Sequence, residues 1–170
     1  MTEQIEQTEE SLEPTRVAHA AEVPTRRYVY LAGPVEEEDT WRSASVEYLA
    51  KLGLEGLDPM RGELLKKVGK RIKTDKPDNL IVARDLNDLK RTADSGGLCI
   101  MNLNTTKTDR RPGATMCELE FCRANGIPVI AIVGKTCHPQ FRDNPWVNVI
   151  AAAIVSSRTA ALKLIEEYFV

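Results

Sequence analysis

The chain has 170 residues, a formal net charge of −2 and a hydrophobic content of 42%. These values are typical of one soluble globular domain with a sizeable core, and they exclude two full domains. Acidic and basic residues are mixed, without the basic stripe of a protein that binds long nucleic acid. No apolar run reaches the roughly 20 residues that span a bilayer. Long nucleic acids and membranes are therefore not expected as partners, whereas a few local arginines can still bind a small anion.

The four cysteines are scattered along the chain and form no C-x-x-C pair. This usage does not indicate a disulfide scaffold, so we expect reduced thiols and a cytoplasmic protein. The start of the chain is acidic and polar, unlike a signal peptide. Residues 1–25 are rich in Glu, Thr, Gln and Ala, and we expect a disordered tail there. The folded domain is expected to cover residues 26–170.

Strand and helix signals alternate from residue 27 onward. Aromatic and aliphatic residues at 27–32 predict a buried strand that ends at Gly33-Pro34. An apolar stripe predicts a helix over residues 40–52, and residues 54–57 predict a second strand. We expect the lysine-rich residues 60–78 to form a solvated loop with a short helix. The next helix is predicted over residues 79–92, with an inward face of Ile81, Val82, Leu86 and Leu89.

The second half of the chain continues the alternation. Further elements are predicted as a buried strand over 96–103, a loop over 104–112, a helix over 113–125, a strand over 128–133 and a helix over 158–168. Residues 147–155 are apolar and fit either a strand or a helix. Alternating strands and helices indicate right-handed βαβ units, and hence a single α/β domain whose parallel sheet has helices on both faces. Ligands of such sheets bind at the carboxyl ends of the strands.

Several familiar sites are absent from the sequence. The first predicted strand is followed by Ala-Gly-Pro-Val rather than G-x-G-x-x-G, and no P-loop motif occurs. The only histidines are His19 and His138, which argues against a typical zinc site and a Ser-His-Asp triad. Carboxylates, arginines, amides and a few aromatic residues remain as candidates at the ligand-binding edge of the sheet.

Glu118 is the first candidate for chemistry. It lies in the second turn of a helix that follows a loop at this edge, where the helix dipole would keep its carboxylate ionised. An ionised carboxylate can attack a carbon centre and form a covalent glycosyl-enzyme. Position alone favours the alternative, an acid that merely complements the dipole.

Asp85 is the second candidate, beside Arg84 on the preceding helix. A surface ion pair between Arg84 and Asp88, four residues apart, is the simpler interpretation of this segment, although it accounts for Asp88 better than for Asp85. Arg61 follows a strand end and is suited to phosphate or carboxylate recognition, or is an ordinary exposed arginine.

Three further residues lie at predicted strand ends or nearby. Asn102 could read a base edge or a sugar hydroxyl, or could be a turn residue. Trp41 and Tyr30 could line a base pocket, although aromatic residues at such positions more often belong to the core.

Taken together, these residues resemble the nucleoside 2-deoxyribosyltransferase family and the related nucleoside 5′-monophosphate N-glycosidases. The resemblance covers residues 28–169. It rests on Tyr30-Leu-Ala-Gly-Pro34, Trp41-Arg42, Asp58-Pro-Met-Arg-Gly62, Arg84-Asp85, Met101-Asn-Leu103, Gly113 through Glu118-Leu119, and Gly126-Ile-Pro-Val-Ile130. The Leu-Ala-Gly-Pro start and the glutamate-bearing helix are together its most specific parts.

The resemblance implies a flavodoxin-like, Rossmann-like sheet and cleavage or exchange of an N-glycosidic bond. It implies that Glu118 is the nucleophile, that Asp85 assists proton transfer to the leaving base and that Tyr30 orients the nucleophile. It also implies a homo-oligomer, with Asn144 or Asn148 as the residue lent to a neighbouring subunit, and no metal or cofactor. The residues expected to bind the substrate are Gly33, Pro34, Trp41, Arg61, Arg84, Asn102 and Gly113.

Two departures from the family pattern concern the substrate. Arg110 and Arg111 stand where the family often has an acid, which favours a phosphorylated substrate. The acidic residues 36–39 argue the other way, because relatives that accept a 5′-phosphate often carry serines and small basic residues there. Nucleoside and nucleoside 5′-monophosphate therefore both stay open, as do transfer and hydrolysis.

Two other functions remain open. One is a nucleotide-binding sensor or sequestering module, which needs the pocket but no nucleophile. The other is a glycohydrolase of nicotinamide dinucleotides, similar to TIR domains, which also uses a glutamate. Asp85 discriminates best between an enzyme and a binding module, because only the enzyme must protonate a base.

Overall fold

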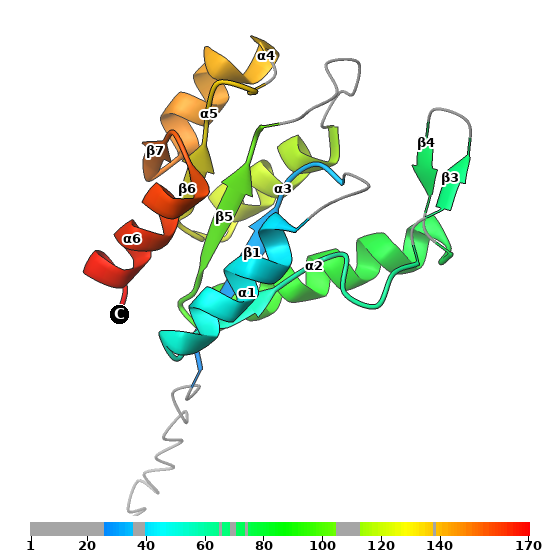
Figure 1. The fold of residues 1–170 in the computed structure, drawn as a ribbon, viewed down its shortest axis with the longest axis horizontal. Coiled ribbons are helices and arrows are strands. Elements are labelled where there is room, and N and C mark those ends of the chain that lie inside the picture. Colours follow the sequence, from blue (N-terminus) through cyan, green and yellow to red (C-terminus); the bar gives the residue numbers. More distant parts are fainter. Residues whose placement is uncertain are drawn as a thin grey trace, which may run out of the picture.

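The computed structural model describes residues 26–35, 40–64, 66–68, 71–73, 75–104, 113–137 and 139–170. Five parallel strands form its main sheet in the order β2-β1-β5-β6-β7 (Figure 1). These strands are β1 (Tyr28–Ala32), β2 (Glu55–Leu57), β5 (Leu98–Asn102), β6 (Val129–Ile132) and β7 (Ala153–Val155). Taken along the chain, this is the flavodoxin-like order 2-1-3-4-5, so the predicted fold class is confirmed.

Side chains alternate along each strand, so both faces of the sheet are apolar and helices cover both of them. Val29 and Leu31 of β1 point toward α1 (Trp41–Lys51) and α6 (Arg158–Tyr168). Tyr30 and Ala32 point toward the opposite layer, which contains α2 (Asp78–Asp94), α3 (Gly113–Ala124) and α5 (Pro145–Ile150). A one-turn helix, α4 (Pro139–Arg142), precedes α5. The strand alternation therefore assigns Tyr30 to the same layer as α2 and α3.

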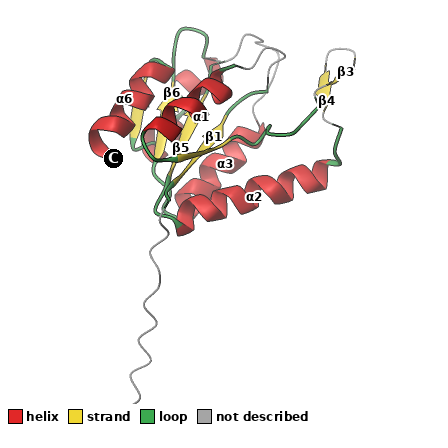
Figure 2. Cartoon of the chain, turned by 60° about the horizontal axis from the view of Figure 1, so that its bottom comes forward, coloured by secondary structure: helices red, strands yellow, loops and turns green. Residues whose placement is uncertain are grey.

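The lysine-rich segment forms a β-hairpin, so the predicted loop with a short helix was wrong. Strands β3 (Lys66–Val68) and β4 (Arg71–Lys73) pair in antiparallel fashion and form a separate sheet. Only two residues separate the strands, and the first of them is Gly69, a residue type that short hairpin connections favour. The hairpin lies beyond the start of α2 and projects away from the main sheet (Figures 1 and 2).

The predicted inward face of α2 was only partly right. Leu89 is buried, but Val82 and Leu86 are 55% and 45% exposed. Asp88 and Thr92 are buried instead. The amino-terminal part of α2 extends beyond the sheet, so its apolar side chains have no core to face (Figure 2).

The ambiguous segment 147–155 contains both predicted structures, the end of α5 and the edge strand β7. Within the described ranges, no helix has the length and apolar character needed to cross a membrane. The predicted tail, residues 1–25, lies outside the described residues.

Candidate active site

A hydrogen bond between Tyr30 and Glu118 is the centre of the candidate site. The Tyr30 hydroxyl donates to Oε1 of Glu118 across 2.7 Å. Tyr30 is fully buried on β1, and Glu118 lies in the second turn of α3. Because Leu119 and Cys122 anchor α3 in the core, the helix presents Glu118 to the phenol. The structure thus brings together two of the three residues for which the resemblance implies a catalytic role.

Burial dominates the ionisation of Glu118. It raises the pKa of this carboxyl from its ordinary value of 4.5 to about 7, against the lowering effect of the Tyr30 hydrogen bond. The charge of Asp85 raises this pKa further, and Arg42 lowers it. The expectation that the helix dipole keeps Glu118 firmly ionised is therefore wrong, because near neutral pH its protonated and ionised forms are both populated.

Asp85 is electrostatically coupled to both of these residues. Its charge raises the pKa of Tyr30, where burial is the largest cause and Glu118 the next, and it also raises the pKa of Glu118. Burial raises the pKa of Asp85 itself, although the neighbouring guanidinium of Arg84 opposes this effect. The site therefore contains two partly buried carboxyl groups, both of higher pKa than usual, and a phenol that remains a hydrogen-bond donor.

Arg42 organises the chain at the end of β1, a role that the sequence analysis did not assign to it. Its side chain is 1% exposed, and its guanidinium donates to the carbonyl oxygens of Leu31 at 3.1 Å, Gly33 at 2.6 Å and Pro34 at 3.3 Å. It also lies 3.7 Å from Oδ1 of Asp58. The buried stripe of α1 consists of Arg42, Ser45 and Leu49. An arginine at a helix position whose spacing assigns it to the core was therefore the feature of the sequence that could have indicated this role.

Gly33, Trp41 and Asn102 lie together beside this turn. Gly33 has a φ of +149°, and a Cβ there would lie 2.7 Å from the carbonyl oxygen of Asn102 and 3.3 Å from the Trp41 ring. The Trp41 indole nitrogen is buried and has no hydrogen-bond partner. The side-chain oxygen of Asn102 accepts from the backbone N–H of Asn104 at 3.1 Å. This contact is typical of a turn residue, the alternative to a substrate-binding role for Asn102.

The two predicted substrate-binding arginines fix the loop after β2 to α2. Arg61 donates to Asp88, whose side chain is 1% exposed, across 2.8 Å. Arg84 donates to the carbonyl oxygen of Pro59 and to Glu63, and contacts Asp85 at 3.3 Å. Asp88 therefore pairs with Arg61, and with Arg91 at 3.5 Å, in place of the expected i,i+4 partner Arg84.

The remaining predicted positions lie along the same edge or outside the described residues. Gly113 is exposed at the first position of α3. The acidic residues 36–39 and the arginines at 110 and 111, which bear on the phosphate question, lie outside the described residues. Within the described ranges, no three His, Cys, Asp or Glu side chains gather as metal ligands would.

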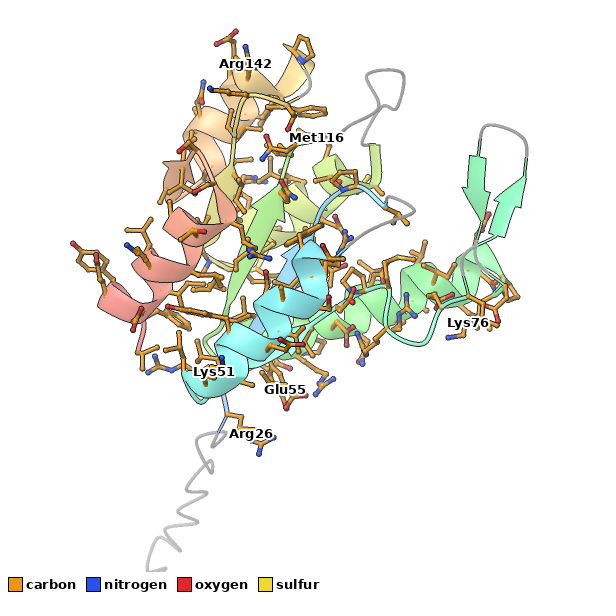
Figure 3. The ribbon with its side chains drawn as sticks, in the orientation of Figure 1. Arg26, Lys51, Glu55, Lys76, Met116 and Arg142 are labelled. Carbon is orange, nitrogen blue, oxygen red and sulfur yellow. The ribbon has the colours of Figure 1, made fainter. Side chains whose placement is uncertain are left out.

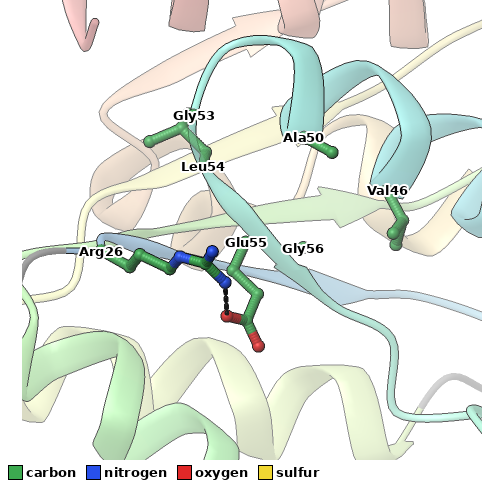
Figure 4. A pocket seen from close by; sticks show the side chains of 7 residues that line it. All are labelled: Arg26, Val46, Ala50, Gly53, Leu54, Glu55 and Gly56. Carbon is green, nitrogen blue, oxygen red and sulfur yellow. Dashed lines mark ion pairs between the residues drawn. The ribbon is translucent and has the colours of Figure 1, made fainter.

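A separate cavity of about 210 Å³ lies at the opposite end of the sheet. It lies between α1 and the edge strand β2, and its lining includes Val46, Leu54 and the ion pair of Arg26 with Glu55 at 3.5 Å (Figure 4). Ligands of open α/β sheets bind at the carboxyl ends of the strands, whereas Arg26 and Glu55 lie at the amino-terminal ends of β1 and β2. We therefore assign the candidate site to Tyr30, Asp85 and Glu118.

Comparison with known proteins gives a fold-level likeness. No protein-family profile and no curated protein sequence matches the chain. A solved structure of a conserved protein from Enterococcus faecalis V583 superposes with a TM-score of 0.57 and 15% identity, over 84% of this chain and 98% of that one. A 2-desoxiribosyltransferase from Leishmania mexicana superposes with a TM-score of 0.54 and 13% identity, over 85% of this chain and 99% of that one. The chain therefore has the fold of these two proteins, one of which is a 2-desoxiribosyltransferase.

Proposed function

We propose that this protein is an enzyme that cleaves or exchanges the N-glycosidic bond of a (deoxy)nucleoside or nucleoside 5′-monophosphate. The observation that carries the proposal is the 2.7 Å hydrogen bond between the Tyr30 hydroxyl and Glu118, with Asp85 close enough to perturb both. A partly buried glutamate held by a phenol, beside a second acid, has the parts that this reaction needs. The fold shared with a 2-desoxiribosyltransferase supports the same reaction class.

In the first step, an oxygen of ionised Glu118 forms a bond to the anomeric carbon. The bond between that carbon and the base nitrogen breaks, and its electron pair stays on the base. The carboxylic acid of Asp85 donates a proton to the departing base and becomes a carboxylate. The transition state resembles an oxocarbenium ion, so the negative charge of Glu118 stabilises it.

In the second step, the glycosyl ester on Glu118 is broken. Water attacks the anomeric carbon in a hydrolase, whereas the nitrogen of another base attacks in a transferase. The attacking group loses a proton to the Asp85 carboxylate, which restores the starting state. Tyr30 keeps one Glu118 oxygen hydrogen-bonded through both steps, which orients the other oxygen toward the sugar.

The described arginines bear on whether the substrate carries a phosphate. Arg61 is paired with Asp88, and Arg84 with Glu63 and Asp85. These pairings reduce the positive charge that either side chain can offer to a 5′-phosphate. The proposal therefore includes nucleosides and their 5′-monophosphates, and activity measurements must decide between them.

The test is incubation of the purified protein with deoxynucleosides, ribonucleosides and their 5′-monophosphates, with and without a second free base. Chromatography follows released base and newly formed nucleoside, and Glu118→Ala is the control. Free base alone indicates hydrolysis, and a new nucleoside indicates transfer. Absence of turnover for every compound would reject the proposal in favour of a nucleotide-binding module, and unchanged turnover in Glu118→Ala would reject Glu118 as the nucleophile.

We also propose that the protein is a homo-oligomer. Leu80, Val82 and Leu86 of α2 are 57%, 55% and 45% exposed, and Trp146 of α5 is 61% exposed, all in the layer that contains the site. Val82 and Leu86 are four residues apart, so they share one face of α2, and neighbouring exposed apolar side chains are typical of protein interfaces. Light scattering on a sizing column should give a multiple of 18.9 kDa, and a monomer at micromolar concentration would contradict this proposal.

Asn144 and Asn148 differ as candidates for the residue lent to a neighbouring subunit. The Asn144 side chain caps α5 by accepting from the Trp146 backbone at 2.9 Å, whereas Asn148 is exposed. A role for either residue in a partner's site stays a prediction.

A further inference from the structure

Glu63 is a buried carboxylate next to the candidate site for which the mechanism above has no use. It ends two tight turns of the loop after β2. In these turns the backbone N–H of Arg61 donates to the Asp58 carbonyl, and the backbone N–H of Glu63 donates to the Met60 carbonyl, each across 3.1 Å. Gly62, with a φ of +69°, supplies the left-handed residue between them. The turns direct the Glu63 side chain toward α2, where it is fully enclosed, with 0% exposure.

Two cations share one oxygen of this carboxylate. Oε1 of Glu63 accepts from Nζ of Lys76 at 3.0 Å and from the guanidinium of Arg84. Lys76 lies just before α2, near the base of the projecting hairpin (Figure 3). Although burial raises the pKa of Glu63, these hydrogen bonds outweigh it and hold that pKa below its ordinary value, so the group is ionised.

The other oxygen of Glu63, Oε2, is buried without a hydrogen-bond partner. An unsatisfied buried carboxylate oxygen destabilises a protein, so a contribution to stability does not explain why a glutamate occupies this position. The loop is also held without it, because Arg61 is paired with Asp88 and Arg84 reaches the Pro59 carbonyl. The specific effect of Glu63 is to fix the orientation of the Arg84 guanidinium, which donates to it.

Arg84 connects Glu63 to Asp85. One terminal nitrogen of its guanidinium donates to Glu63, while the other and Nε contact Oδ1 of Asp85 at the longer distances of 3.3 and 3.4 Å. Charge-assisted hydrogen bonds are normally about 2.7–2.9 Å long. The shorter contacts of the guanidinium are therefore those to Glu63 and Pro59, and its contacts with Asp85 are the longer ones.

We propose that Glu63 is a positioning residue for the proposed general acid Asp85, and that it acts by holding Arg84. With Glu63 present, Arg84 is oriented and partly neutralised, and Asp85 can carry the proton that the leaving base needs. Without it, the guanidinium turns toward its remaining carboxylate partner and stabilises the ionised form of Asp85. This inference rests on the proposed function, because only an acid that donates a proton needs such protection.

Other charged groups near Asp85 fix the direction of the expected change. On α2, Arg84 lowers the pKa of Asp85 and Asp88 raises it, and Arg61 of the preceding loop lowers it. Glu118 of α3 and the phenol of Tyr30 on β1 complete the surroundings. Loss of the Glu63 charge leaves the cations in excess, so both this direct effect and the movement of Arg84 favour ionised Asp85.

The test is the pH dependence of kcat in Glu63→Gln, which keeps the shape of the side chain and removes its charge. Catalysis requires protonated Asp85, so we expect the alkaline fall of kcat to move to lower pH by about 1 unit, with KM changed much less. Asp94→Asn is the matched control, because Asp94 pairs with Lys90 at 2.9 Å on the exposed side of the same helix. An unchanged alkaline limb in Glu63→Gln would overturn the proposal.

Two further variants test the route through Arg84. In an Arg84→Gln background, Glu63→Gln should produce less than half of its shift in the parent protein, because the connecting cation is gone. A full shift in that background would overturn the route. Lys76→Met leaves Glu63 to Arg84 alone and should leave the alkaline limb unchanged or move it upward. A downward shift would contradict the proposal even if Glu63→Gln failed to fold.

A direct titration separates this inference from the proposed function. Carbon-13 NMR of the labelled Asp85 carboxyl group gives its pKa in the parent protein and in Glu63→Gln without any substrate. A lower pKa in the variant, together with an inactive parent protein, would reject the proposed function and retain the positioning role. An active parent protein whose Asp85 pKa is the same as in Glu63→Gln would retain the proposed function and reject the positioning role of Glu63.

Discussion

Replacement of Glu118 by Gln should stabilise the protein at alkaline pH while abolishing its activity. The folded protein raises the pKa of Glu118 from 4.5 to about 7, so the folded state binds this proton more tightly than the unfolded state does. Stability therefore falls as the pH rises between these values, because the unfolded chain loses the proton first. Glutamine is never charged and retains an oxygen that can accept from the Tyr30 hydroxyl.

The magnitude follows from the size of the pKa change. A rise from 4.5 to about 7 corresponds to about 3 kcal/mol above pH 8, at about 1.4 kcal/mol per pKa unit. The same effect is nearly absent below pH 4.5, where the carboxyl is protonated in both states. For a domain of this size, about 3 kcal/mol raises Tm by roughly 6–12 °C.

Thermal unfolding followed by circular dichroism at several values between pH 5 and pH 8.5 tests this reasoning. The Tm difference between Glu118→Gln and the parent protein should grow from pH 5 to about pH 8, and level off once Glu118 is ionised in both the folded and the unfolded state. Glu120→Gln is the matched control, because Glu120 is an exposed carboxylate on the same helix, paired with Arg123 at 2.6 Å. It should bring no stabilisation that grows with pH. A Glu118→Gln variant that is equally stable or less stable at pH 8.5 would refute the raised pKa of the buried Glu118 carboxyl.

Three further substitutions test other parts of the site. Asp85→Asn should lower kcat by about 10²–10⁴-fold and remove the alkaline limb of the pH profile, because no group is left that must keep its proton for the base to depart. Full activity in that variant would exclude proton donation by Asp85. Tyr30→Phe should move the acid limb upward, since its hydrogen bond lowers that pKa, and an unmoved limb would contradict the orienting role. Gly33→Ala should cost about 1–3 kcal/mol in denaturant unfolding, because its methyl group would lie 2.7 Å from the Asn102 carbonyl oxygen at a φ of +149°, and an unchanged midpoint would contradict the close packing there.

Four strands of the main sheet, β1, β2, β5 and β6, and most helices could be predicted from the sequence because their signals are local. The buried run that ends at Gly33-Pro34 and the apolar strand around Ile100 need no knowledge of the rest of the chain. The pairing of Tyr30 with Glu118 could be inferred only through the family resemblance, because 88 residues separate them. Their hydrogen bond depends on how β1 and α3 pack, which no spacing rule reveals.

The errors have a shared physical cause. The burial of Asp88 and the exposure of Val82 follow from how far α2 extends beyond the sheet, which is a property of the tertiary structure. The buried Arg42 and Glu63 were missed because their partners, backbone carbonyls for Arg42 and cations for Glu63, come from other segments of the chain. The raised pKa of Glu118 was missed for the same reason, because the dipole is a local property of its helix whereas burial is not.

The central claim is that the sugar becomes covalently bound to Glu118. Its most direct test is acid quenching of the enzyme during turnover of the best substrate in the nucleoside panel, followed by peptide mass spectrometry. The account predicts a glycosyl adduct on Glu118 that disappears when the substrate is exhausted and never forms in Glu118→Ala. Base release at the parental rate in Glu118→Ala, with no adduct on any peptide of the parent protein, would contradict it.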